Sequence, residues 1–111
     1  MSDLIKIAVD AMGGDDAPKK IINGIIHNHK NYKNNFFIIF GNEKKIIPYI
    51  NSKIDKKFYK IVNTENYVKS TDSPLEAAKK GKDTSMWLSI NSVKNKETDI
   101  VISAGNTGAL L

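Results

Sequence analysis

Two short loops hold the residues whose types and spacing could do chemistry. The first is Asp10-Ala-Met-Gly-Gly-Asp-Asp16, and the second is Ser103-Ala-Gly-Asn-Thr-Gly108. Each loop follows a short apolar run that is typical of a buried strand and precedes a helical pattern. The carboxyl ends of parallel strands lie on one edge of a sheet, where open α/β folds bind ligands and helix N-termini offer N–H groups to anions. We therefore expect the two loops to meet at a common rim.

The second loop has a composition that suits an oxyanion. Gly105 and Gly108 allow the backbone to approach a ligand closely. The Asn106 amide and the Thr107 hydroxyl can donate to phosphate or carbonyl oxygen. The loop lacks the lysine of a Walker loop and the full Gly-x-Gly-x-x-Gly fingerprint. Taken alone, its composition therefore also fits the simple start of a helix.

The first loop places three carboxylates around Gly13 and Gly14. Asp10, Asp15 and Asp16 could together ligate Mg²⁺ through oxygen. We favour the alternative in which Asp16 caps the following helix, Asp10 orients the loop through backbone N–H groups and Asp15 faces solvent. We therefore predict no metal at this loop, and we expect no cofactor.

Hydrophobic periodicity supplies the elements that would position these loops. Short apolar runs predict strands at residues 4–9, 36–40, 58–62 and 99–103. Helical spacing and capping signals predict helices at residues 18–29, 43–51, 74–80 and 84–93. Strands that alternate with helices indicate βαβ units, and hence an α/β fold with a mainly parallel sheet. We expect Trp87 in the core, and we expect His27 and His29 at the surface or at a helix end.

Composition excludes several classes of protein. The 111 residues carry a net charge of +5, but all 17 basic residues are lysine, so the arginine fork that usually reads bases and phosphates is missing. We predict no nucleic-acid partner. The absence of cysteine excludes disulfides and thiolate nucleophiles. No apolar run approaches the roughly 20 residues of a membrane span, and the first ten residues lack a signal-peptide pattern, so we interpret the chain as cytoplasmic.

Three segments resemble the signatures of a known family. Residues 7–18 read Ile-Ala-Val-Asp-Ala-Met-Gly-Gly-Asp-Asp-Ala-Pro, and residues 99–110 read Asp-Ile-Val-Ile-Ser-Ala-Gly-Asn-Thr-Gly-Ala-Leu. With residues 72–86 between them, they are similar in order and spacing to the bacterial phosphate acyltransferase family of phospholipid synthesis. The resemblance implies a Rossmann-like three-layer α/β/α sandwich. It also implies an enzyme that moves a fatty acyl group from acyl carrier protein to inorganic phosphate.

The resemblance further implies partners and length. Members of the family act as homodimers in the cytoplasm, associate with the membrane surface, and supply acyl phosphate to a membrane glycerol 3-phosphate acyltransferase. They are much longer than this chain. We therefore expect residues 1–111 to be the amino-terminal part of one larger α/β domain, and the isolated piece to be inactive.

The resemblance and the chemistry together indicate the site residues. The two walls of a phosphate or oxyanion site would be Gly105, Asn106, Thr107 and Gly108 on one side, and Asp10, Gly13, Gly14 and Asp15 on the other. Three lysines could steer phosphate or an acidic carrier protein, or could simply be the solvated end of a helix: Lys79, Lys80 and Lys82. The catalytic residues stay unknown. Ser85 and Ser103 lack His and Asp companions at a recognisable spacing, so no hydrolase triad is predicted.

Two other interpretations stay open at this point. The chain could be a phosphate- or nucleotide-binding α/β module without catalysis. It could also be an interaction domain that is complete as it stands, which would be expected to unfold in one cooperative transition.

Overall fold

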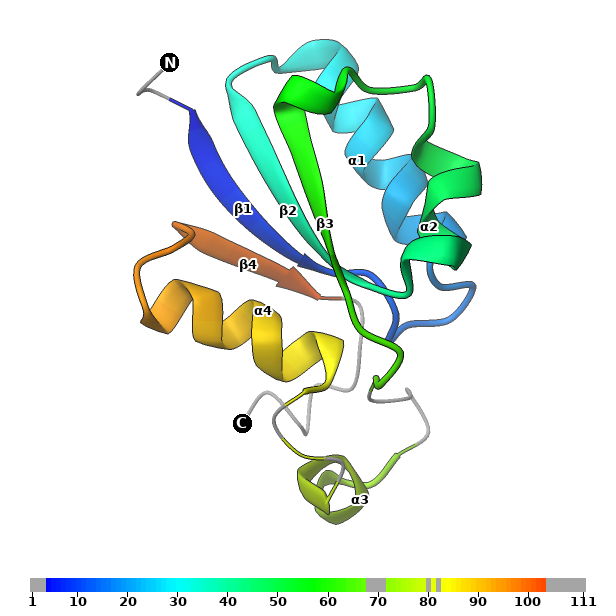
Figure 1. Cartoon of the computed structure of the whole chain (residues 1–111), viewed down its shortest axis with the longest axis vertical. Helices are drawn as coiled ribbons and strands as arrows, with labels where there is room; N and C mark the ends of the chain where they lie inside the picture. The colour runs from blue at the N-terminus through cyan, green and yellow to red at the C-terminus, as the bar shows by residue number, and fades with distance from the viewer. Residues whose placement is uncertain (1–3, 68–71, 80, 82, 104–111) are drawn as a thin grey trace.

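A parallel sheet forms the centre of the computed structural model, which describes residues 4–67, 72–79, 81 and 83–103. The strands lie in the order β3-β2-β1-β4, and each neighbouring pair is parallel. Their bounds are β1 Ile5–Asp10, β2 Asn35–Gly41, β3 Tyr59–Asn63 and β4 Ile100–Ser103. The helices are α1 Lys19–Asn31, α2 Glu43–Ile50, α3 Pro74–Lys79 and α4 Ser85–Lys94, with a short 3-10 turn η1 at Lys56–Phe58. The fold is therefore the predicted α/β class (Figure 1).

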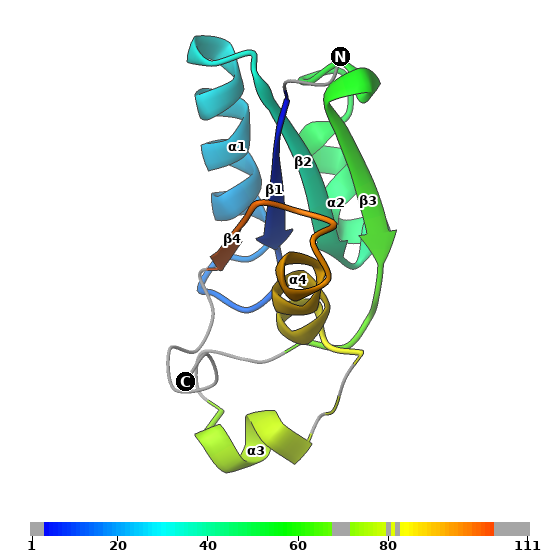
Figure 2. The same cartoon turned by 90° about the vertical axis from the view of Figure 1, so that its left-hand side faces the viewer.

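Helices cover both faces of the sheet. Side chains alternate between the faces along each strand. Ile7 and Val9 of β1 pack with the buried isoleucines of α1 and α2, whereas Ala8 packs on the other face, against the side of the sheet that Leu88 of α4 covers. In Figure 2 α4 lies in front of the strands, whereas α1 and α2 lie behind them. The described residues thus form the three layers that the family resemblance implied.

The order in which the chain adds strands to the sheet reverses at β1. From β1 it moves to β2 through α1 and to β3 through α2, always away from β1. It then returns through α3 and α4 to place β4 on the other side of β1. Because crossover connections between parallel strands are right-handed, this reversal places the connecting helices on opposite faces of the sheet. The carboxyl ends of β1 and β4 therefore flank the topological switch point, where folds of this kind bind ligands.

The predicted elements agree with the observed ones to within a few residues. In α1 the isoleucine stripe faces the sheet, with Ile22 and Ile25 buried. At α3 the predicted capping box is present: the Ser73 Oγ accepts from the Glu76 N–H, and the Glu76 carboxylate accepts from the Ser73 N–H. In α2 the helix continues through Pro48 to Ile50.

Two predictions about single side chains were wrong. Asp16 does not cap α1, because its backbone lies in the left-handed region with a φ of 58° and Pro18 takes the N-cap position without a side-chain hydrogen bond. Instead the Asp16 carbonyl accepts from the Lys20 N–H at 3.1 Å. Trp87 is 37% exposed rather than in the core. The sheet-facing side of α4 is occupied mainly by small residues, which let this helix pack closely and leave Trp87 at its margin.

Gly41, at the end of β2, provides the space for the loop that follows β1. A methyl group at Gly41 would lie 2.8 Å from Cγ of Met12 and 2.9 Å from Cδ1 of Ile46. Met12 is itself buried. The loop after β1 is therefore anchored in the core by the Met12 side chain, which would have to shift if Gly41 carried a Cβ atom.

We expect Gly41→Ala to lower the free energy of unfolding by about 1 to 3 kcal/mol, because Met12 and Ile46 must shift to admit the methyl group. Gly24→Ala is the matched control, since a methyl group there meets nothing within 4 Å on α1. It should raise the same quantity by about 0.5 to 1 kcal/mol through helix propensity. Urea unfolding followed by circular dichroism measures both. Equal effects of the two substitutions would contradict the close packing at Gly41.

His29 is buried in the last turn of α1, which agrees with the prediction of a surface or helix-end position. Its ring lies 4.7 Å from that of Phe58, and only 5% of the residue is exposed. Among the described residues, its Nδ1 has no hydrogen-bond partner. Burial lowers the pKa of His29 below its ordinary value of 6.5, the charge of Lys33 lowers it further, and Asp55 opposes the shift.

This lowered pKa predicts a pH-dependent stability. As pH falls through 6.5, the unfolded chain binds a proton at His29 before the folded chain does, so the free energy of unfolding decreases until the folded-state pKa is passed. His29→Phe should remove this decrease. His27→Gln, at an exposed position of the same helix, should retain it. Urea unfolding at a series of pH values measures the slope, and an unchanged slope in His29→Phe would contradict the account.

Candidate functional site

Asp10 is the centre of a buried hydrogen-bond network at the carboxyl edge of the sheet. Its Oδ1 accepts from the Ser85 hydroxyl at 2.6 Å and from the Met12 N–H at 3.2 Å. Its Oδ2 accepts from the Ser103 hydroxyl at 2.8 Å. Asp10 is 1% exposed and Ser85 is fully buried. One carboxylate thus joins the loop after β1, the first residue of α4 and the last residue of β4.

The strand register explains how these groups meet. Asp10 and Ser103 are paired residues of the neighbouring strands β1 and β4, so their side chains point to the same face. That face is the one that α4 covers. The Thr84 hydroxyl caps α4 by accepting from the Trp87 N–H, and the Asn66 carbonyl accepts from the Ser85 N–H. These contacts fix the start of α4, and so they hold Ser85 where its hydroxyl can donate to Asp10.

The loop after β1 changes from buried to exposed along its length. Ala11 and Met12 are buried, and the Ala11 N–H donates to the Phe40 carbonyl at 3.1 Å. Gly13 is buried, Gly14 is half-buried and Asp15 is exposed. The Met12 N–H bond to Asp10 matches the predicted role of Asp10 in orienting the loop. The two glycines lie between an anchored start and an exposed turn.

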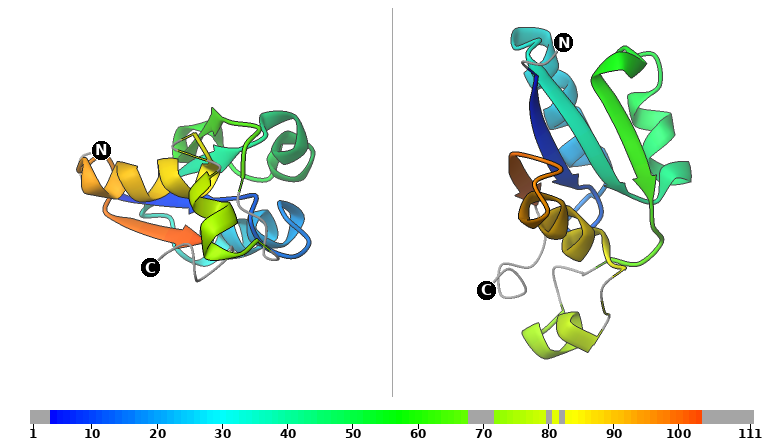
Figure 3. Two further views of the ribbon diagram at one scale, coloured as in Figure 1. Left: turned by 90° about the horizontal axis from the view of Figure 1, so that it is seen from below. Right: turned by 60° about the vertical axis from the view of Figure 1, so that its left-hand side comes forward.

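The structure describes some of the predicted site residues but not others. Gly105, Asn106, Thr107 and Gly108 lie outside the described residues, as do Lys80 and Lys82. Lys79 is exposed at the end of α3, which lies beyond the carboxyl edge of the sheet (Figure 3). The strand ends from which the two loops depart, Asp10 and Ser103, are adjacent.

Ser85 and Ser103 were not predicted as members of this network. The spacing of a catalytic triad does not reveal their contact, which is made with a carboxylate 75 residues from Ser85 and 93 residues from Ser103. A signal for Ser103 was present, because it ends one predicted strand and Asp10 directly follows another. Ser85 could be found only once α4 was known to cover that face.

Within the part of the chain described, the two serines and Asp10 form a closed hydrogen-bond network. Both hydroxyls donate to the Asp10 carboxylate, and His29 packs on Phe58 on the opposite face of the sheet, so neither described histidine position supplies the Ser–His pair of a hydrolase triad there. In residues 4–67, 72–79, 81 and 83–103, no group of three His, Cys, Asp or Glu side chains could hold a metal ion. No helix within the same ranges is long and apolar enough to span a membrane.

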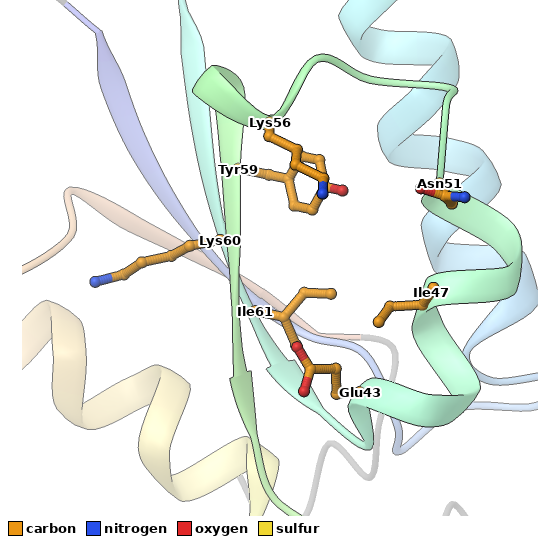
Figure 4. A pocket seen from close by; sticks show the side chains of 7 residues that line it. All are labelled: Glu43, Ile47, Asn51, Lys56, Tyr59, Lys60 and Ile61. Atoms are coloured by element: carbon orange, nitrogen blue, oxygen red, sulfur yellow. The ribbon is translucent and has the colours of Figure 1, made fainter.

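A groove of about 350 Å³ lies at the other edge of the sheet, between α2 and β3. Ile47 of α2 and Ile61 of β3 point toward one another there, and Lys60 points away to the other side of the strand (Figure 4). Its lining includes Glu43 and Lys56. The groove is on the face that α1 and α2 cover, so it is separate from the Asp10 network.

The fold and the polar network define an open α/β protein with its candidate binding site at a topological switch point. A model of the family described as fatty acid synthesis protein matches residues 5–111. The chain belongs to this family.

Several curated relatives share its sequence. A phosphate acyltransferase of Pelagibacter ubique is 62% identical over all 111 residues, which make up 33% of the relative. A phosphate acyltransferase of Listeria welshimeri is 47% identical over 96% of the chain, which corresponds to 31% of the relative. A phosphate acyltransferase of Enterococcus faecalis is 43% identical, and the alignment again covers 96% of the chain and 31% of the relative. The chain thus spans about a third of the length of the relatives that it matches.

We expect Asp10→Ala to lower the free energy of unfolding by roughly 2 to 4 kcal/mol, because two hydroxyls and one N–H lose a buried acceptor. Asp15→Ala, at an exposed position of the same loop, should cost much less. Urea unfolding compares the two. Similar costs would show that the Asp10 contacts contribute little to the fold.

Proposed function

We propose that the chain is the amino-terminal part of one larger α/β acyltransferase domain, which transfers a fatty acyl group from acyl carrier protein to inorganic phosphate. The observation that carries the proposal is the 62% identity, along the whole chain, to a protein named phosphate acyltransferase. The family description, fatty acid synthesis protein, supports the same area of metabolism.

The chemistry of this reaction sets requirements for the site. A phosphate oxygen attacks the thioester carbonyl carbon, a carbon–oxygen bond forms, and the carbon–sulfur bond then breaks. The carrier thiolate leaves and takes up a proton, and acyl phosphate is the product. The phosphate itself is the nucleophile, so the enzyme needs no covalent intermediate. It must hold a dianion next to the thioester and stabilise the tetrahedral oxyanion.

The loops at the switch point are our candidates for these two tasks. Gly105, Asn106, Thr107 and Gly108 would supply N–H and side-chain donors to phosphate or to the oxyanion. Gly13 and Gly14 would form the opposite wall beside Asp10, with Asp15 at its rim. The adjacency of Asp10 and Ser103 at the ends of β1 and β4 supports this assignment, because it starts both loops at one place.

The partners follow from the same proposal. Lys79, Lys80 and Lys82 would attract phosphate or an acidic carrier protein, and the exposure of Lys79 on α3, beyond the carboxyl edge, supports such a role. The complete protein would act as a homodimer in the cytoplasm, at the membrane surface. A glycerol 3-phosphate acyltransferase in that membrane would consume the acyl phosphate.

The direct test incubates the full-length gene product with acyl-carrier-protein thioester and inorganic phosphate. We expect acyl phosphate, trapped as a hydroxamate with hydroxylamine, and release of the carrier thiol. Absence of both products, under conditions in which the Listeria relative forms them, would reject the proposal. Binding of nucleotide without binding of carrier protein would indicate a non-catalytic module instead.

Asn106→Ala should lower kcat/KM by about 10²-fold in this assay, the usual loss when one oxyanion donor is removed. Asn23→Ala is the control, because Asn23 is an exposed residue of α1. It should leave kcat/KM unchanged. An equal effect of the two variants, or none of either, would remove Asn106 from the site.

A further inference from the structure

We propose that Ser85 is a positioning residue for the anion-binding loops, acting through the carboxylate of Asp10. This inference rests on the proposed function only for the identity of the anion, which is phosphate. Ser85 was not among the residues that the sequence indicated for the site. It does not touch the loops directly, so its effect on them passes through Asp10.

The geometry of Asp10 gives Ser85 this role. The Ser85 hydroxyl and the Met12 N–H donate to the same oxygen, Oδ1, at 2.6 and 3.2 Å. The position of that oxygen therefore sets where the chain leaves β1 toward Gly13. A hydroxyl–carboxylate bond of this length is charge-assisted and among the stronger hydrogen bonds in proteins.

The second oxygen extends the same control to β4. Oδ2 accepts from the Ser103 hydroxyl at 2.8 Å, and Ser103 is the last residue before the second loop departs. A planar carboxylate cannot rotate one oxygen without moving the other. A change at Ser85 therefore also reaches Ser103, at the end of β4.

Electrostatics gives the contact a second consequence. Asp10 is a buried acid beside a site that is proposed to bind a dianion, and an exposed negative charge there would repel the ligand. Three donors converge on this carboxylate and disperse its charge. Removal of the Ser85 donor would leave the charge of Asp10 less compensated by hydrogen bonds, and its side chain less fixed.

Ser89 provides a matched control on the same helix. It is also fully buried, and its hydroxyl donates to the Met86 carbonyl at 2.8 Å within α4. Ser89→Ala therefore removes the same atom from the same helix without a change at Asp10. Any effect of Ser85→Ala that Ser89→Ala lacks belongs to the Asp10 contact.

The experiment measures the affinity of the full-length gene product for inorganic phosphate by calorimetry, in the unmodified protein and both variants. We expect Ser85→Ala to raise the Kd for phosphate about tenfold, and Ser89→Ala to leave it within about twofold. The KM for phosphate should rise in parallel, with a smaller change in the KM for the carrier thioester. Equal phosphate affinity in the unmodified protein and in Ser85→Ala would overturn the proposal.

Hydrogen exchange at the backbone amides of residues 11–14 is the second measurement. It reports how well the loop amides are protected whether or not the protein forms acyl phosphate, so a failed acyltransferase assay leaves this test intact. We expect faster exchange in Ser85→Ala than in Ser89→Ala. If exchange in residues 11–14 is the same in both variants, Ser85 has only a general packing role, and the inference is wrong.

Discussion

The candidate site depends on one buried carboxylate with three hydrogen-bond donors. A charge in the interior is costly unless it is paired or hydrogen-bonded, and Asp10 meets that condition with Ser85, Ser103 and Met12. The donors come from three different elements, so the same contacts that make the charge tolerable also hold α4, β4 and the first loop together. The reversal of the chain beside β1 creates the place for this network, because it brings β4 to the free side of β1 and α4 to the face where Asp10 points.

Local patterns were sufficient to predict most of the elements. The apolar runs of β1 and β2, the isoleucine stripe of α1 and the Ser73–Glu76 capping box each depend on residues within a few positions of one another. Propensity and capping act over that same short range. The burial of single side chains depends on packing that local patterns do not show, and the prediction for Trp87 failed for that reason. His29 is buried because Phe58, on η1, covers it, and Trp87 is exposed because the small side chains of α4 take the sheet-facing positions.

The site itself was predictable only in part. In a parallel sheet, loops that follow strands begin at the carboxyl edge, so this position of both loops was predictable. The register confirms that the strands before them, β1 and β4, are neighbours. That Ser85 reaches Asp10 could not be inferred, because it depends on the face that the returning helix covers. The assignment of Gly105, Asn106, Thr107 and Gly108 stays a prediction from composition and resemblance, supported by the place where β4 ends.

The central claim is that the loops after β1 and β4 form one anion site. Hydrogen exchange of the full-length gene product, with and without inorganic phosphate, tests it most directly. The account predicts that phosphate slows exchange in residues 11–17 and 104–108 together, and leaves the amides of α2 and β3 unchanged. Protection confined to one of these loops, or found instead at the groove between α2 and β3, would contradict it.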